Sequence, residues 1–393
     1  MQNELSIFEL EEEEGQETES DLNINISEFT QAVIWGTDWT TETIVNQLKK
    51  GNINLKPRFQ RRDAWGKKNK SKFIESLIIG LPIPQIILAE NKNKKGTYIV
   101  IDGKQRLLSI RQFFADKAGD DFEQLKLSGL EIINELQGVT IDSLRKNQDY
   151  SEYLSALENQ PIRTIVIRNW VNDSFLYTVF LRLNTGSVRL SPQELRQALN
   201  PGEFIDFVED FSTSSKSIRK VLKLKKPDPR MRDVELVVRY FAFKYFIERY
   251  NGNLKAFLDL TVEELNEKWI YEEQLIENNA EQLNEAIEAT INIFGAEFAF
   301  SKWIYGKYQK TFNRAIYDIM TYYFSIAGVR EQAIENKEAV ENKFRELCEN
   351  DYEFLRSFET STKNLEPTFK RFDTWGKALS KILNIKILIP RRL

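Results

Sequence analysis

The stretch of sequence that decides the fold is Tyr98-Ile99-Val100-Ile101-Asp102-Gly103-Lys104-Gln105-Arg106. Its first four residues form a continuous apolar run, which predicts a strand buried on both faces. Asp102-Gly103 predicts a tight turn at the end of this strand, and a helix is expected from Lys104 to about Phe114. This order places backbone amides at a helix N-terminus, where they can bind an anion.

Both helices and strands are expected on either side of this stretch. Upstream of the turn they are a helix capped by Thr40 or Thr41 and ended by Gly51, a helix from about Lys70 to Ile79, and a strand over 86–89. Downstream they are a strand over 162–167, a helix over 174–182, and a helix that begins at the capping box Ser191-Pro192-Gln193-Glu194 and ends before Asn200-Pro201-Gly202.

From about Pro229 the pattern is nearly all helical, with an apolar and aromatic run over 234–246 and a second capping box at Thr261-Val262-Glu263-Glu264. The sequence therefore predicts an α+β N-terminal unit followed by a mostly α-helical C-terminal unit. We expect an acidic disordered tail over 1–30, the α+β domain over 31–215 and the helical domain over 216–393.

Composition excludes several classes of function. The 393 residues are 41% apolar and 12% aromatic, enough for two hydrophobic cores. There is no histidine, which excludes Ser-His-Asp and Cys-His catalysis and histidine-dependent metal hydrolases. The single cysteine, Cys348, excludes an internal disulfide and a thiolate metal cluster. No apolar run is long enough to span a membrane, and the acidic start is unlike a signal peptide, so we expect a cytoplasmic protein without membrane contact.

Charge is concentrated at the N-terminus. Residues 1–21 contain nine acidic and no basic residues, so subtracting −9 from the net charge of −4 leaves +5 on the rest of the chain. Such a segment is expected to be a disordered, solvated arm. The alternative is an arm that occupies a basic groove in place of nucleic acid.

Three polar, glycine- or arginine-rich corners lie at the ends of regular elements in the α+β unit. They are Asp102–Arg106, Pro57–Arg62 and Arg182–Gly186. Arginine and lysine in the first two are suited to phosphate contact, and Asp102 could coordinate a divalent cation or orient a water molecule. The alternative for a single Asp-Gly corner is a tight turn with solvated charges. Because three corners occur in one unit, we expect them to converge on one site.

A resemblance to a known family is carried by the string from Pro57 to Pro84, the IDGKQR turn over 101–106, RLNTG over 182–186 followed by LSPQEL over 190–195, and DPRMRDVELVVRYFAF over 228–243. Together they resemble the N-terminal domain of GmrSD-type modification-dependent restriction systems. The resemblance covers roughly residues 40–250. The family's motif is DGQQR, and Lys104 stands here where glutamine is more common. The resemblance implies a ParB/sulfiredoxin-like fold and binding and hydrolysis of a nucleoside triphosphate, with Mg²⁺. The implied nucleotide-binding residues are Gln60, Arg61, Asp102, Gly103, Lys104, Gln105, Arg106 and Asn184. Many relatives carry an HNH-type nuclease module that requires histidine, so any cutting function would lie in a partner.

Two further segments suggest nucleic-acid contact. Lys216, Arg219, Lys220, Lys223, Lys225, Lys226, Arg230 and Arg232 are accompanied by one acid, Asp228, so this stretch could neutralise several phosphates. Its alternatives are a solvated connector and a docking site for the acidic tail. Between Trp303 and Arg314 aromatic residues alternate with cations, as in single-strand binders, although aromatic residues at this spacing more often belong to a core.

The sequence thus predicts a nucleotide-dependent regulator of an antiphage system that acts on DNA or through a protein partner, including a second copy of itself. One alternative is a DNA-, RNA- or protein-binding module without turnover. The other is a metal-dependent nuclease in which Asp102-Gly103-Lys104 supplies half of the site. That nuclease needs a second carboxylate, for which Asp63 and Glu90 are the nearest candidates.

Overall fold

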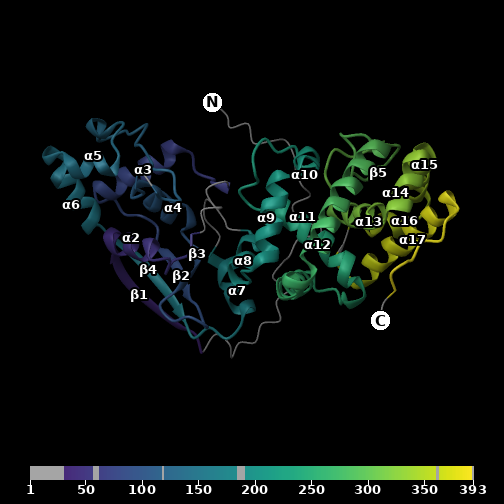
Figure 1. Ribbon diagram of the computed structural model, residues 1–393, viewed down its shortest axis with the longest axis horizontal. Coiled ribbons are helices and arrows are strands. Elements are labelled where there is room, and N and C mark those ends of the chain that lie inside the picture. The colour runs from purple at the N-terminus through teal and green to yellow at the C-terminus, as the bar shows by residue number, and fades with distance from the viewer. Residues whose placement is uncertain (1–30, 56–61, 117–118, 184–190, 360–362, 392–393) are drawn as a thin grey trace. The chain divides into compact units, whose positions relative to one another are not determined.

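The computed structural model describes residues 31–55, 62–116, 119–183, 191–359 and 363–391, and the acidic tail over 1–30 lies outside these ranges (Figure 1). The contacts divide the chain into two compact units, one ending at Leu199 and the other beginning at Asn200. We expected the boundary after residue 215, which is later in the sequence than this division. Helix α9 (Glu203–Ser214) lies between the two positions, and it packs on α11 (Arg232–Phe246) and α12 (Leu254–Phe294) of the second unit.

A mixed four-stranded sheet forms the centre of the first unit (Figure 1). Its strands, in spatial order, are β1 (Val33–Thr40), β4 (Pro161–Arg168), β2 (Ile86–Glu90) and β3 (Tyr98–Asp102). β4 pairs antiparallel with β1 and parallel with β2, and β2 pairs antiparallel with β3. The α+β class is therefore confirmed, whereas the ParB/sulfiredoxin-like fold stays a prediction.

The prediction that residues 98–101 form a strand buried on both faces is wrong in its second part. β3 is the edge strand of the sheet, where it pairs with β2, and Tyr98 also forms an isolated bridge with Ile53. Tyr98, Ile99 and Val100 therefore stay partly exposed. Ile101 alone is fully buried, at 0% exposure. The apolar run therefore marks a strand, while its position in the sheet depends on the pairing of distant segments.

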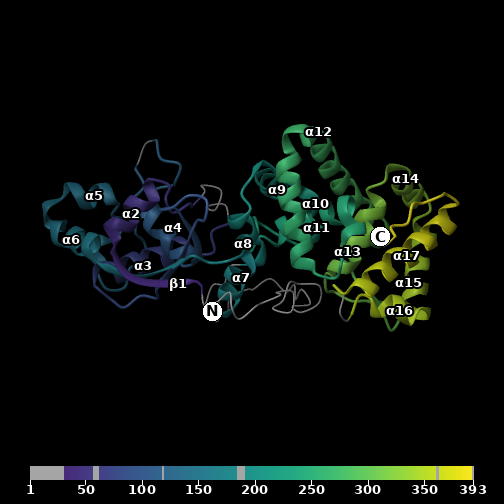
Figure 2. The same cartoon turned by 90° about the horizontal axis from the view of Figure 1, so that it is seen from below.

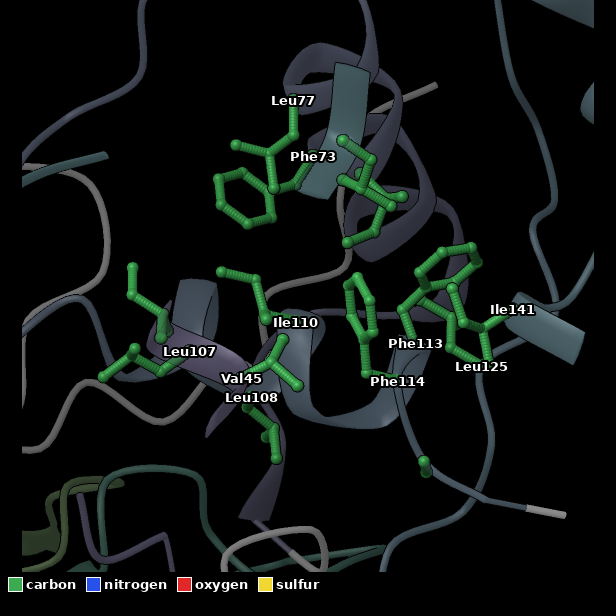
Figure 3. Close-up of a cluster of buried hydrophobic side chains, with 14 of the residues drawn as sticks. Val45, Phe73, Leu77, Leu107, Leu108, Ile110, Phe113, Phe114, Leu125 and Ile141 are labelled. Atoms are coloured by element: carbon green, nitrogen blue, oxygen red, sulfur yellow. The ribbon is translucent and has the colours of Figure 1, made fainter. Parts of the chain in front are cut away.

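The helices of the first unit contribute to two clusters of buried apolar side chains, and Figure 3 shows part of the larger one. These helices are α2 (Thr41–Lys49), α3 (Lys67–Ile78), α4 (Lys104–Phe113), α5 (Ile141–Lys146), α6 (Ser151–Asn159), α7 (Asp173–Leu183) and α8 (Pro192–Leu199). The predicted cap of α2 is confirmed, because the Thr40 hydroxyl accepts a hydrogen bond from the Thr43 amide at 3.2 Å. The core contains Val45, Phe73, Leu107 and Phe113, side chains from α2, α3 and α4. Burial of their apolar surface stabilises the position of α4.

The second unit is helical, as expected, with one two-stranded hairpin (Figure 2). Besides α9, α11 and α12 it contains α10 (Lys216–Val221), β5 (Trp303–Ile304), β6 (Lys307–Tyr308), α13 (Arg314–Phe324), α14 (Ala327–Glu335), α15 (Lys337–Asn350), α16 (Tyr352–Arg356) and α17 (Leu365–Leu383). At its centre Arg239 of α11 donates two hydrogen bonds, of 3.0 and 2.5 Å, to the buried Asp318 of α13. Cys348 is buried in α15, and this burial raises its pKa to about 12.

The second capping box predicted from sequence is wrong. Thr261 lies inside α12, where its hydroxyl donates to the Phe257 carbonyl at 2.8 Å, and the helix is capped instead by Asn253, which accepts from the Ala256 amide at 3.0 Å. A threonine three residues before a glutamate also occurs within helices, so the pattern alone does not fix a helix start. Within the described ranges no helix is both long enough and apolar enough to cross a bilayer.

Candidate functional site

The first turn of α4 is the centre of the candidate site. Gly103 immediately precedes this helix with φ of 99°, in the left-handed region that favours glycine. A side chain at this position would also meet Ile86 Cγ1 at 3.1 Å and the Arg106 Nη2 atom at 3.3 Å. The residue at the N-cap position, Gly103, has no side chain with which to cap the helix. The predicted strand, tight turn and helix are thus confirmed.

Arg106 links this turn to two neighbouring segments. Its Nη2 atom donates to Asp102 Oδ2 at 2.7 Å and to the Gln85 carbonyl at 2.9 Å. The side chain of Arg106 is 14% exposed and that of Asp102 is 32% exposed. The Arg106 Nε atom is buried and has no hydrogen-bond partner among the residues that the structure describes. A buried donor of this kind is costly unless a further acceptor, such as a phosphate oxygen, binds beside it.

The segment that directly follows the second predicted corner reaches the same turn. The Trp65 amide donates to Gln105 Oε1 and to Asp63 Oδ1, each at 3.2 Å. Asp63 pairs with Lys70, which also donates to Gln112 of α4 at 2.5 Å. Burial lowers the pKa of Lys70 to about 8, although the charge of Glu123 acts in the opposite direction. Gln60 and Arg61 lie outside the described residues, so their predicted roles stay predictions.

Helix α8, which follows the third predicted corner in the sequence, is joined to the turn by a buried ion pair. Lys104 Nζ lies 2.5 Å from Glu194 Oε1, and the two side chains are 8% and 6% exposed. Glu194 is also the acidic member of the predicted capping box, which is confirmed: its Oε2 atom accepts from the Ser191 amide at 2.7 Å, and its amide donates to the Ser191 hydroxyl at 3.1 Å. Asn184, the predicted binding residue of this corner, lies outside the described ranges.

The sequence did not predict that the polar side chains of α8 are buried. Gln193, Glu194, Arg196 and Gln197 are all less than a tenth exposed, although the helix has only two turns. Arg196 Nη1 donates to Gln193 Oε1 at 2.6 Å. One signal in the sequence could have indicated this burial. Glu194 of the capping box is negatively charged, and Lys104, which stands where the DGQQR motif has glutamine, could have been predicted as its partner.

The described residues do not assemble a metal site from protein ligands alone, because they contain no group of three acidic or cysteine side chains close enough together. Asp102 pairs with Ile87 in the sheet and Glu90 pairs with Tyr98, so Glu90 lies three residues along β2, roughly 10 Å away. Asp63, the other candidate, is engaged by Lys70. The predicted second carboxylate of a nuclease site is therefore not found at Asp102.

The predicted basic stretch forms α10 and the loop that follows it. Of its cations, Lys216, Lys220, Lys223, Lys225, Lys226 and Arg230 are exposed. Lys220 pairs with Glu288 at 3.2 Å, where both side chains are about half exposed, and Arg232 pairs with the buried Asp228. Exposed pairs of this kind are weak and can exchange for phosphates.

The aromatic residues between Trp303 and Arg314 mostly pack against other side chains, as the core alternative predicted. Phe312 is 2% exposed, and Trp303 packs edge-on against Tyr308 with ring centroids 4.8 Å apart. Tyr305 is different, because 95% of it is exposed.

Comparison with known proteins identifies the first unit. Residues 41–200 match the family model described as the N-terminal domain of the GmrSD restriction endonuclease. No curated protein and no solved structure gives a significant match. The match contains all three predicted corners but ends before the stretch over 228–243. A domain of this kind implies a restriction-type antiphage system. Residues 41–200 of this chain are therefore similar to the N-terminal domains of GmrSD restriction endonucleases.

Proposed function

We propose that this chain is a nucleotide-dependent regulator of a restriction-type antiphage system, and that the first turn of α4 binds the phosphates of a nucleoside triphosphate. The observation that carries the proposal is the convergence of three separate segments on this turn. Arg106 contacts the Gln85 carbonyl, Gln105 contacts the Trp65 amide, and Lys104 contacts Glu194.

The residues at this turn fit a phosphate group. Backbone amides at a helix N-terminus favour an anion, and Gly103 allows it to approach closely because there is no Cβ. The unpartnered Nε atom of Arg106 supplies a charge-assisted donor in the same place. Lys104 has its charge balanced by Glu194, so we assign it to holding α8 against α4.

Mg²⁺ fits here only together with phosphate. It prefers one or two carboxylates plus phosphate oxygens, and Asp102 offers a single, partly exposed carboxylate. The Arg106 guanidinium holds that carboxylate at the N-terminal end of the helix. In the proposed reaction Asp102 orients the attacking water or a magnesium ligand, and Arg106 stabilises charge on the phosphate oxygens.

A binding module without turnover is the second candidate, and the exposed cations over 216–230 favour nucleic acid as its ligand. The chain contains no histidine, so an HNH-type nuclease cannot form within it. We infer that DNA cleavage is carried out by a partner protein, which the nucleotide-bound chain controls in the cytoplasm.

Phosphate release tests hydrolysis directly. The purified chain is incubated with each nucleoside triphosphate and Mg²⁺, and we expect release with at least one of them. Asp102→Asn should abolish this release while nucleotide binding is retained. The matched control is Asp120→Asn, which removes another carboxylate bound by an α4 arginine, Arg111, at 2.7 and 2.8 Å. Full activity in Asp102→Asn would contradict its role, and no release with any nucleotide would contradict hydrolysis.

A further inference from the structure

The hairpin formed by β5 and β6 has an unusual turn. Its two central residues are Tyr305 and Gly306, with φ of 52° and 73°. Two positive φ angles define a type I′ turn, which normally has asparagine or aspartate before the glycine. A bulky aromatic residue is disfavoured in this conformation. Tyr305 therefore destabilises the turn that it forms.

Packing against the described residues does not offset this cost, because 95% of Tyr305 is exposed. Phe300 shows the opposite case. It also has positive φ, 67°, but it is 1% exposed and packs against Phe312 and Tyr317 with centroid distances of 5.5 and 5.3 Å. A local rule broken without a structural gain is typical of a functional position.

The base of the hairpin is held firmly. Tyr308 stacks on Phe298 with centroids 5.3 Å apart, and Trp303 donates to Glu349 at 2.6 Å. The guanidinium of Arg345 lies over both hairpin rings, 4.6 Å from the centroid of Trp303 and 5.2 Å from that of Tyr308. The exposed ring of Tyr305 is therefore presented on a rigid support, which reduces the entropy lost when a ligand binds it.

Charge around the tip favours an anionic ligand. No acidic residue occurs in the sequence between Glu297 and Asp318, and this interval contains four cations. Two of them, Lys302 and Arg314, are buried beside carboxylates, so the exposed cations are Lys307 and Lys310. Lys307 is exposed next to the turn, and the side chain of Lys310 is 83% exposed. Lys310 lies 3.8 Å from Glu297, whose side chain is 55% exposed, so water screens this pair and a phosphate can replace it.

We propose that the β5–β6 hairpin binds nucleic acid, with Tyr305 stacking on an unpaired base and Lys307 and Lys310 contacting the flanking phosphates. An aromatic face combined with neighbouring cations is the arrangement that binds single strands without sequence preference. This assignment goes beyond the proposed nucleotide-dependent regulation, since it places a nucleic-acid contact in the helical unit.

The test compares affinities of the full chain for a single-stranded DNA labelled with fluorescein. Tyr305→Asn installs the residue that a type I′ turn prefers, so it should preserve or raise the melting temperature and yet weaken binding roughly 5- to 150-fold. Tyr305→Phe keeps the ring and should bind like the wild type. The matched control is Tyr271→Asn on α12, where another tyrosine is 87% exposed, and it should leave affinity unchanged.

Stacking is measured by the fluorescence of the base analogue aminopurine, placed in the single strand. The wild type and Tyr305→Phe should quench this fluorescence, and Tyr305→Asn should not. Equal affinity of Tyr305→Asn and the wild type would overturn the proposal. So would the absence of any binding to single-stranded DNA, which would leave a protein ligand as the partner of the hairpin. Neither result bears on nucleotide binding at α4, which is measured separately by titration.

Discussion

The buried pair of Lys104 and Glu194 allows a quantitative test of how the candidate site is held together. The two side chains are 8% and 6% exposed, with Nζ and Oε1 2.5 Å apart. Lys104→Met leaves the Glu194 carboxylate buried without its charge partner, and Glu194→Gln does the same to the lysine. Glutamine retains an oxygen that can accept from the Ser191 amide, so the helix cap of α8 is preserved.

Removing one member of a buried pair costs about 3–5 kcal/mol, because the remaining charge stays desolvated. Replacing both members removes this penalty, so Lys104→Met with Glu194→Gln should be close to the wild type in stability. In a unit of this size a loss of 1 kcal/mol lowers the melting temperature by about 2–4 °C, so each single variant should melt roughly 6–20 °C lower.

Scanning calorimetry of the full chain provides the measurement. The chain has two compact units, so we expect the transition of the first unit to shift and that of the helical unit to stay. Single variants that melt within about 2 °C of the wild type would show that the pair does not hold α8 against α4. A double variant as unstable as the sum of the singles would refute the coupling between the two residues.

Two further predictions concern stability and nucleic-acid binding. Glu75 is 4% exposed and accepts hydrogen bonds from the backbone amides over 131–133. Burial acts to raise the pKa of Glu75, but these hydrogen bonds and the charge of Lys72 lower it overall, below the ordinary value of 4.5. The ionised carboxylate therefore stabilises the fold at pH values above 4.5. This stabilisation is lost as the pH falls through the lower pKa of the folded state. Glu75→Gln should therefore lower the melting temperature at neutral pH and differ less from the wild type near about pH 3, whereas the exposed Glu131→Gln should have little effect at either pH. Reversing the charges of Lys223, Lys225 and Lys226 together should weaken DNA binding and reduce its salt dependence between about 50 and 200 mM, and an unchanged salt dependence would exclude phosphate contact at this stretch.

The sequence predicted the local features of the site and missed those that depend on distant pairing. Gly103, the capping box at Ser191 and the cap at Thr40 were predictable, because each is set by residues within four positions along the chain. β1 was not predicted, since its sequence includes Gly36 and Asp38 and its first four residues are exposed. It forms a strand because it pairs with β4, more than a hundred residues later.

The composition of the site was only partly predictable for the same reason. Asp102, Gly103, Gln105 and Arg106 share one turn, so their proximity follows from the motif. Glu194 contacts Lys104 across ninety positions of sequence, and no local pattern joins the two. The incorrect helix start predicted at Thr261 shows that a short motif can also mislead. The motif is present in the sequence, but Thr261 lies inside the continuous helix α12.

The central claim is that the first turn of α4 binds the phosphates of a nucleotide, and calorimetric titration of the full chain with each nucleoside triphosphate and Mg²⁺ tests it most directly. We predict that at least one nucleotide binds and that Arg106→Ala weakens its binding by roughly tenfold or more, since a charge-assisted contact contributes about 1.5–3 kcal/mol. Arg111→Ala is the matched control, because it removes another arginine of α4 that pairs with a carboxylate, and it should bind like the wild type. Equal affinity of Arg106→Ala and the wild type, or no binding of any nucleotide, would contradict the claim.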